Sequence, residues 1–71
     1  MSAKEMFKKL GFNQFICCPV EKQDYIEYQN DDNYIWFYPD TKTIEIRFDF
    51  NIDILQAINK QVEELGWNNE E

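Results

Sequence analysis

The sequence contains no histidine, only two glycines and two prolines, and two cysteines that are adjacent, Cys17 and Cys18. Because histidine is the usual general base at neutral pH, its absence leaves both thiols without the partner that activates a catalytic cysteine. A disulfide between neighbours would be strained, and structural zinc needs four cysteine or histidine ligands. We therefore expect no metal, a reducing compartment, and cysteines that serve as small apolar side chains.

A glycine-rich phosphate loop is also missing, because Gly11 and Gly66 each fall at the predicted end of a helix. A solvated surface accounts for the fourteen Asp and Glu side chains without any acid–base pair. A domain of this size has little room for both a core and a water-excluding pocket. We expect no cofactor and no enzymatic activity.

Long apolar runs are absent as well. No stretch approaches the roughly 18 apolar residues that a membrane-spanning helix needs, and Met1 is followed by the polar residues 2–5 instead of a signal peptide. We expect a cytoplasmic protein that does not bind membranes.

Basic side chains are scarce, and the net charge is −7. Residues 1–22 carry four lysines and two glutamates, whereas residues 23–71 carry three basic and twelve acidic side chains. An acidic surface repels phosphate backbones, so direct binding of nucleic acid is disfavoured.

The chain does contain 44% apolar and 17% aromatic residues, enough for one core in a single domain, 1–71, with a frayed tail at 68–71. A short first helix is predicted to begin with a capping box of Ser2 and Glu5 and to end at Gly11. Phe12 then falls where it packs back on Phe7, as in a Schellman ending.

The middle of the chain predicts strands. Segment 43–50 alternates strictly between apolar and polar residues, which indicates a strand with one buried face. Segments 23–29 and 34–38 are further strands, separated by turn residues. Segment 12–18 is a short edge strand or an extended lead-in, because Pro19 cannot join a central ladder. The inward side chains of the clearest strand are expected to be Ile44, Ile46, Phe48 and Phe50.

After Phe50 the apolar period changes to that of a second helix. Asn51 is favoured as its N-cap, with Asp53 as the rival, and Gly66 ends it so that Trp67 folds back on Val62. The predicted apolar stripe is Ile52, Leu55, Ile58, Val62 and Leu65.

Together these elements predict a two-layer α+β domain: an N-terminal helix, an antiparallel meander of three or four strands, and a C-terminal helix. In segment 34–38, Ile35 and Phe37 alternate with three aromatic residues, and only one set can face the helices. With Ile35 and Phe37 inward, the open face carries Tyr25, Tyr34, Trp36 and Tyr38, an aromatic patch typical of protein interfaces. The alternative is an ordinary central strand with Trp36 in the core.

Both ends of the chain carry a resemblance. The segments 4–12, KEMFKKLGF, and 57–67, AINKQVEELGW, resemble the opening and ending of small, largely uncharacterised proteins encoded by phages and prophages of Gram-positive bacteria. Those proteins are also similar in carrying a tyrosine-rich sheet between the two ends. The resemblance implies a phage or prophage setting and offers no catalytic residues to carry over.

Two functions follow as hypotheses. The first is a non-catalytic module that binds a protein partner, or forms a homodimer, through Tyr25, Tyr34, Trp36 and Tyr38. The second is an acidic inhibitor that mimics nucleic acid and blocks a host nucleic-acid-binding protein or nuclease, motivated by the ten acidic side chains between Asp24 and Glu64. Arg47 interrupts the acidic row on the clearest strand and counts against this mimic.

Overall fold

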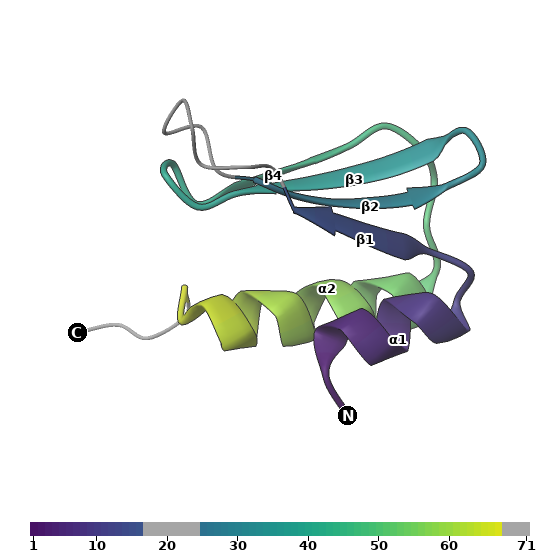
Figure 1. Cartoon of the computed structure of the whole chain (residues 1–71), viewed down its shortest axis with the longest axis horizontal. Coiled ribbons are helices and arrows are strands. Elements are labelled where there is room, and N and C mark those ends of the chain that lie inside the picture. The colour runs from purple at the N-terminus through teal and green to yellow at the C-terminus, as the bar shows by residue number, and fades with distance from the viewer. Residues whose placement is uncertain (17–24, 68–71) are drawn as a thin grey trace.

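A computed structural model describes residues 1–16 and 25–67 and shows two helices beneath one face of a four-stranded sheet (Figure 1). The strands are antiparallel, and their order in the sheet, β1-β2-β3-β4, is their order in the sequence. The predicted α+β meander between two helices is therefore confirmed, with four strands. Cys17, Cys18 and the tail 68–71 lie outside the described residues. The elements are α1 (Ala3–Lys9), β1 (Asn13–Ile16), β2 (Ile26–Asn30), β3 (Asn33–Tyr38), β4 (Thr43–Ile46) and α2 (Ile52–Leu65).

Both ends of α1 follow the local rules that the sequence indicated. Ser2 Oγ accepts from the Glu5 N–H at 3.1 Å, and Glu5 Oε1 accepts from the Ser2 N–H at 3.0 Å, which completes the capping box. The Ser2 backbone N–H also lowers the pKa of the Glu5 carboxyl. Beyond the helix, Gly11 has φ 94°, and the Phe12 N–H donates to the Phe7 carbonyl at 2.9 Å. The Phe7 and Phe12 rings meet edge to face, 5.9 Å between centroids, so the Schellman ending is confirmed.

The caps of α2 are also as predicted. Asn51 Oδ1 accepts from the Ile54 N–H at 3.1 Å, which makes Asn51 the N-cap. Gly66 ends the helix in the left-handed region, and the Trp67 N–H donates to the Val62 carbonyl at 3.2 Å.

The predicted apolar stripe of α2 is wrong in its first turn. Ile52 is 61% exposed and Leu55 is 37% exposed, whereas the buried face contains Ala57, Ile58 and Gln61. Hydropathy alone does not mark Gln61 as a buried position, because its burial depends on a hydrogen-bond partner in the sheet. The helix is therefore rotated so that Ile54, and not Leu55, packs against the core.

The predicted strand 43–50 is too long, because β4 ends at Ile46. Ile46 lies opposite Ile35, and β3 begins at Asn33, so residues beyond Phe48 have no β3 partner. Phe48 still packs against the core, whereas Phe50 is 41% exposed, so the prediction that Phe50 faces inward is wrong.

Between sheet and helices lies a core that is centred on three aromatic rings. Phe7 stacks on Tyr28 with ring centroids 3.9 Å apart, and Phe37 meets both rings edge to face. All three side chains are fully buried. The Tyr28 hydroxyl accepts from Gln14 Nε2 at 2.9 Å and donates to Gln61 Oε1, so this polar group is paired on both sides.

The N-terminus of α1 is held by α2 through a carboxylate. Glu64 Oε2 accepts from the Ala3 N–H at 2.8 Å, a donor that has no partner within its own helix. We expect Glu64→Ala to lower the free energy of unfolding by about 1 kcal/mol, the usual contribution of such a hydrogen bond. Urea denaturation followed by circular dichroism measures this loss. The control is Glu63→Ala, which removes only an exposed ion pair with Lys60 and is expected to cost less than about 0.5 kcal/mol; equal losses would contradict the prediction.

Candidate functional site

The helices cover one face of the sheet (Figure 1). The aromatic residues of β3 other than Phe37 lie on the other face. Ile35 and Phe37 are fully buried, whereas Tyr34, Trp36 and Tyr38 alternate with them and remain partly exposed. The alternative with Trp36 in the core is therefore wrong. We call this uncovered side of the sheet the open face; its main side chains are Phe15, Tyr25, Glu27, Tyr34, Trp36, Tyr38, Glu45 and Arg47.

Trp36 lies at the centre of a row that crosses all four strands. Phe15 is opposite Glu27, Glu27 is opposite Trp36, and Trp36 is opposite Glu45. The indole Nε1–H donates to Glu27 Oε1 at 3.2 Å, so the ring is oriented by a carboxylate of the neighbouring strand. Because cross-strand neighbours lie within about 5.5 Å of each other, these side chains form one continuous surface.

The neighbouring aromatic side chains extend this row in both directions along β3. Tyr34 stacks on Trp36 with centroids 5.3 Å apart and planes 10° apart. Tyr25 lies beside Tyr38, 6.1 Å between centroids, so the structure brings all four predicted interface residues onto one face. The guanidinium of Arg47 lies 6.0 Å from the Trp36 ring centroid, within the range of a cation–π interaction.

Carboxylates on the open face hold these groups in place. Glu45 Oε1 accepts from the Tyr38 hydroxyl at 3.1 Å, and Glu45 Oε2 accepts from Arg47 Nε at 2.8 Å. Burial, followed by the hydrogen bond to Glu45, raises the pKa of Tyr38 above its ordinary value. The hydroxyl therefore stays protonated and continues to donate to Glu45 at physiological pH.

Phe15 is a member of the open face that sequence reasoning missed. Its ring is 51% exposed on β1. Segment 12–18 shows no clear alternation, so its facing could not be assigned without the register that places Phe15 opposite Glu27.

A hollow opens on this side of the molecule. It measures about 280 Å³ and is lined by polar and aromatic side chains at the β2–β3 turn, among them Asp32, Tyr34 and Arg47. Within residues 1–16 and 25–67, no three carboxylates or thiols gather closely enough to hold a metal ion, and no helix is long and apolar enough to cross a membrane.

No protein-family model, curated protein or solved structure matches this chain. The resemblance of segments 4–12 and 57–67 to phage and prophage proteins therefore stays a prediction.

Proposed function

We propose that this chain is a non-catalytic protein-binding module that uses the open face, with Trp36 as its central contact residue. The observation that carries the proposal is a row of partly exposed aromatic side chains on a sheet face that none of the described elements covers. Tyrosine and tryptophan contribute large apolar areas at small entropic cost, and they dominate the energetics of protein interfaces. Tyr34 and Trp36 are already stacked on each other, so little ordering is left for the binding step.

The charges favour a basic partner over a second copy of the chain. Glu27 and Glu45 lie on either side of Trp36, and the whole chain carries a net charge of −7. In a symmetric dimer centred on Trp36 these carboxylates would face their own copies and repel. A partner that presents lysine or arginine beside an apolar patch would instead pair with them.

The nucleic-acid mimic is less well supported. A mimic needs a row of free carboxylates, whereas Glu27 and Glu45 accept hydrogen bonds from Trp36, Tyr38 and Arg47. The aromatic side chains that these carboxylates orient would bury apolar area on binding, and this apolar contribution to the affinity persists at high salt. The resemblance of the two ends to phage and prophage proteins supports a cytoplasmic protein of the bacterial host as the partner.

We expect Trp36→Ala to weaken partner binding at least tenfold, as for the central residue of an interface. The control is Ile52→Ser, which removes a 61% exposed apolar side chain from α2. Each variant is used to capture proteins from lysates of Gram-positive bacteria, and the affinity of each captured protein is then measured by calorimetry. Both variants should keep the circular dichroism spectrum of the folded chain.

Four outcomes decide the proposal. A partner that is retained by Ile52→Ser and lost with Trp36→Ala supports the proposal, provided that binding survives in 1 M salt. At that concentration the attraction between charges extends over only about 3 Å. A partner that high salt releases completely would favour the mimic. Equal capture by Trp36→Ala, or a dimer of this chain that Trp36→Ala dissolves, would overturn binding of a basic partner by the open face.

A further inference from the structure

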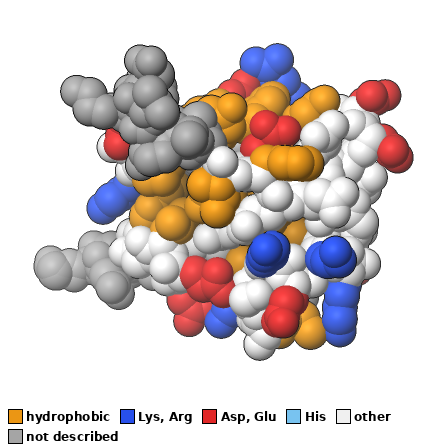
Figure 2. All heavy atoms as spheres, in the orientation of Figure 1, with side chains coloured by type: hydrophobic (Ala, Val, Ile, Leu, Met, Phe, Trp, Pro, Cys, Tyr) orange, Lys and Arg blue, Asp and Glu red, His pale blue; other side chains and the backbone are white. Residues whose placement is uncertain are grey.

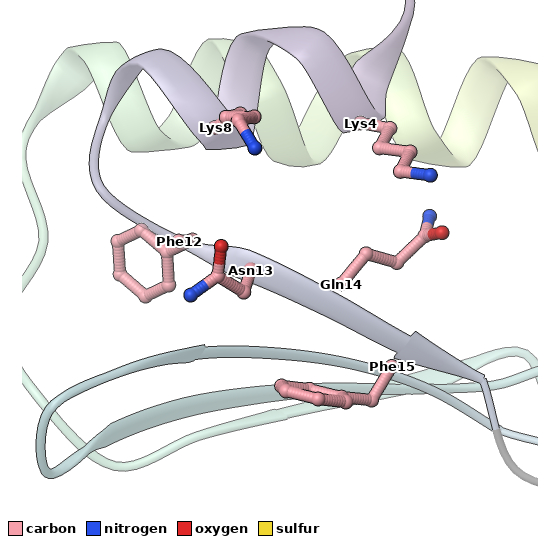
Figure 3. Close-up of a pocket in the computed structure, with 6 residues that line it drawn as sticks. All are labelled: Lys4, Lys8, Phe12, Asn13, Gln14 and Phe15. Atoms are coloured by element: carbon pink, nitrogen blue, oxygen red, sulfur yellow. The ribbon is translucent and has the colours of Figure 1, made fainter.

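A second surface lies along the free edge of β1. Among residues 1–16 and 25–67, the strand order leaves β1 with β2 as its only partner in the sheet. A hollow of about 310 Å³ runs beside this edge, between β1 and α1 (Figure 3). Its lining comes from two short stretches of chain, Lys4 and Lys8 on α1 and residues 12–15 leading into and along β1.

The charge of this hollow is opposite to that of the molecule. Lys4 and Lys8 are one helical turn apart, and Figure 3 shows both side chains directed toward β1. The hollow contains no carboxylate, and neither lysine forms an ion pair with any residue that the structure describes. Figure 2 shows basic side chains over α1 on the face that also carries hydrophobic side chains over the sheet.

The edge itself lacks the usual protection against an added strand. Natural sheets guard their edges with charged side chains, proline or bulges, and the four residues of β1, Asn13–Ile16, are uncharged and contain no proline. Phe15 is 51% exposed and Ile16 is 67% exposed. Since neighbouring residues of a strand point to opposite faces, these two side chains offer apolar contact on both faces of an incoming strand.

We propose that an extended acidic segment of a partner protein adds to β1 as a fifth strand, with its carboxylates paired to Lys4 and Lys8. The spacing fits. Residues four apart on a helix are separated by about 6 Å along its axis, and alternate residues of a strand by about 6.6 Å. A segment with glutamate or aspartate at two alternate positions therefore places one carboxylate opposite each lysine.

The orientation of the two elements supports the same arrangement. In Figure 3 the Lys8 side chain lies over Asn13 and the Lys4 side chain lies over Gln14, so the two cations follow the strand one after the other. Backbone hydrogen bonds along the edge supply affinity, and the paired lysines select the sequence of the segment.

The test is an NMR titration of the ¹⁵N-labelled full chain with three synthetic hexapeptides. The first carries glutamate at alternate positions (Thr-Glu-Val-Glu-Val-Thr), the second has lysine in place of glutamate, and the third has its two glutamates adjacent. We expect saturable shifts at the amides of Asn13–Ile16, and at least tenfold weaker binding of the second and third peptides. The double variant Lys4→Gln/Lys8→Gln should weaken the first peptide at least fivefold, whereas Lys9→Gln, which removes one positive charge of α1 outside the hollow, should not.

Shifts confined to the open face, equal affinity for the lysine peptide, or unchanged affinity in Lys4→Gln/Lys8→Gln would each overturn the proposal. So would the absence of any saturable shift, or a dimer of this chain that occupies the edge of β1 in place of the peptide. Trp36→Ala should leave peptide binding unchanged, which separates this site from the proposed function of the open face.

Discussion

Phe7→Ala is expected to leave most of the chain unfolded at 25 °C, whereas Phe15→Ala is expected to leave the stability nearly unchanged. Phe7 is fully buried, stacks on Tyr28 at 3.9 Å, and meets Phe12 and Phe37 edge to face. Truncation of a buried phenylalanine costs about 3–5 kcal/mol. The core of a domain this small supplies only about 3–5 kcal/mol of net stability, so the loss consumes nearly all of it.

Circular dichroism and urea denaturation measure the effect, and Phe7→Leu provides a variant that stays folded. Leucine keeps most of the buried area but loses the ring stack on Tyr28, so we expect a lower urea midpoint with the fold retained. Phe15→Ala is the matched control because its ring is 51% exposed on the sheet. A Phe7→Ala protein with an unchanged urea midpoint would show that the core is not organised around this ring.

The parts of the fold that depend on neighbours in the sequence were predictable. The capping box of Ser2 and Glu5 and the Asn51 cap each involve residues within one helical turn. Gly11 likewise ends α1 through contacts that span five residues. Alternation reduced the facing of β3 to two choices, and the burial of Ile35 and Phe37 in the structure decides between them.

The parts that depend on distant residues were not predictable. The rotation of α2 is set by Gln61, whose burial requires the Tyr28 hydroxyl from a different element. Likewise, β3 begins at Asn33 and leaves residues beyond Phe48 without a partner, a limit that is visible only once the register is known.

The same distinction holds for the two candidate surfaces. Alternation placed Tyr34, Trp36 and Tyr38 together on one face of their strand, so the sequence named these residues, whereas the structure decides that this face is the open one. The hollow beside β1 was missed, because Lys4 and Lys8 come close to the strand only through the packing of α1. A lysine on a helix is ordinarily a solvated side chain, and nothing local distinguishes these two.

Tyr28→Phe is expected to lower the free energy of unfolding by about 1–3 kcal/mol, although the ring stack on Phe7 is kept. The substitution removes the hydroxyl that links Gln14 to Gln61, and Gln61 is only 5% exposed. The amide oxygen of Gln61 would remain buried without this donor, and the folded state would then bear the full desolvation cost of that oxygen. A second substitution, Gln61→Leu, should recover part of the loss in the Tyr28→Phe background while destabilising the wild-type chain. A double-mutant cycle measured by urea denaturation checks this coupling, and strictly additive losses would contradict it.

The same hydroxyl is expected to make the folded state less stable at alkaline pH. Burial, aided by the negative charge of Glu64, raises the pKa of Tyr28 above its ordinary value near 10. The folded state therefore keeps a proton that the unfolded state loses, so this stabilisation is complete below about pH 10 and is lost as the pH rises through the folded pKa. We expect the free energy of unfolding to fall more steeply above pH 10 in the wild-type chain than in Tyr28→Phe. Parallel slopes in the two proteins would show that Tyr28 does not control the alkaline transition.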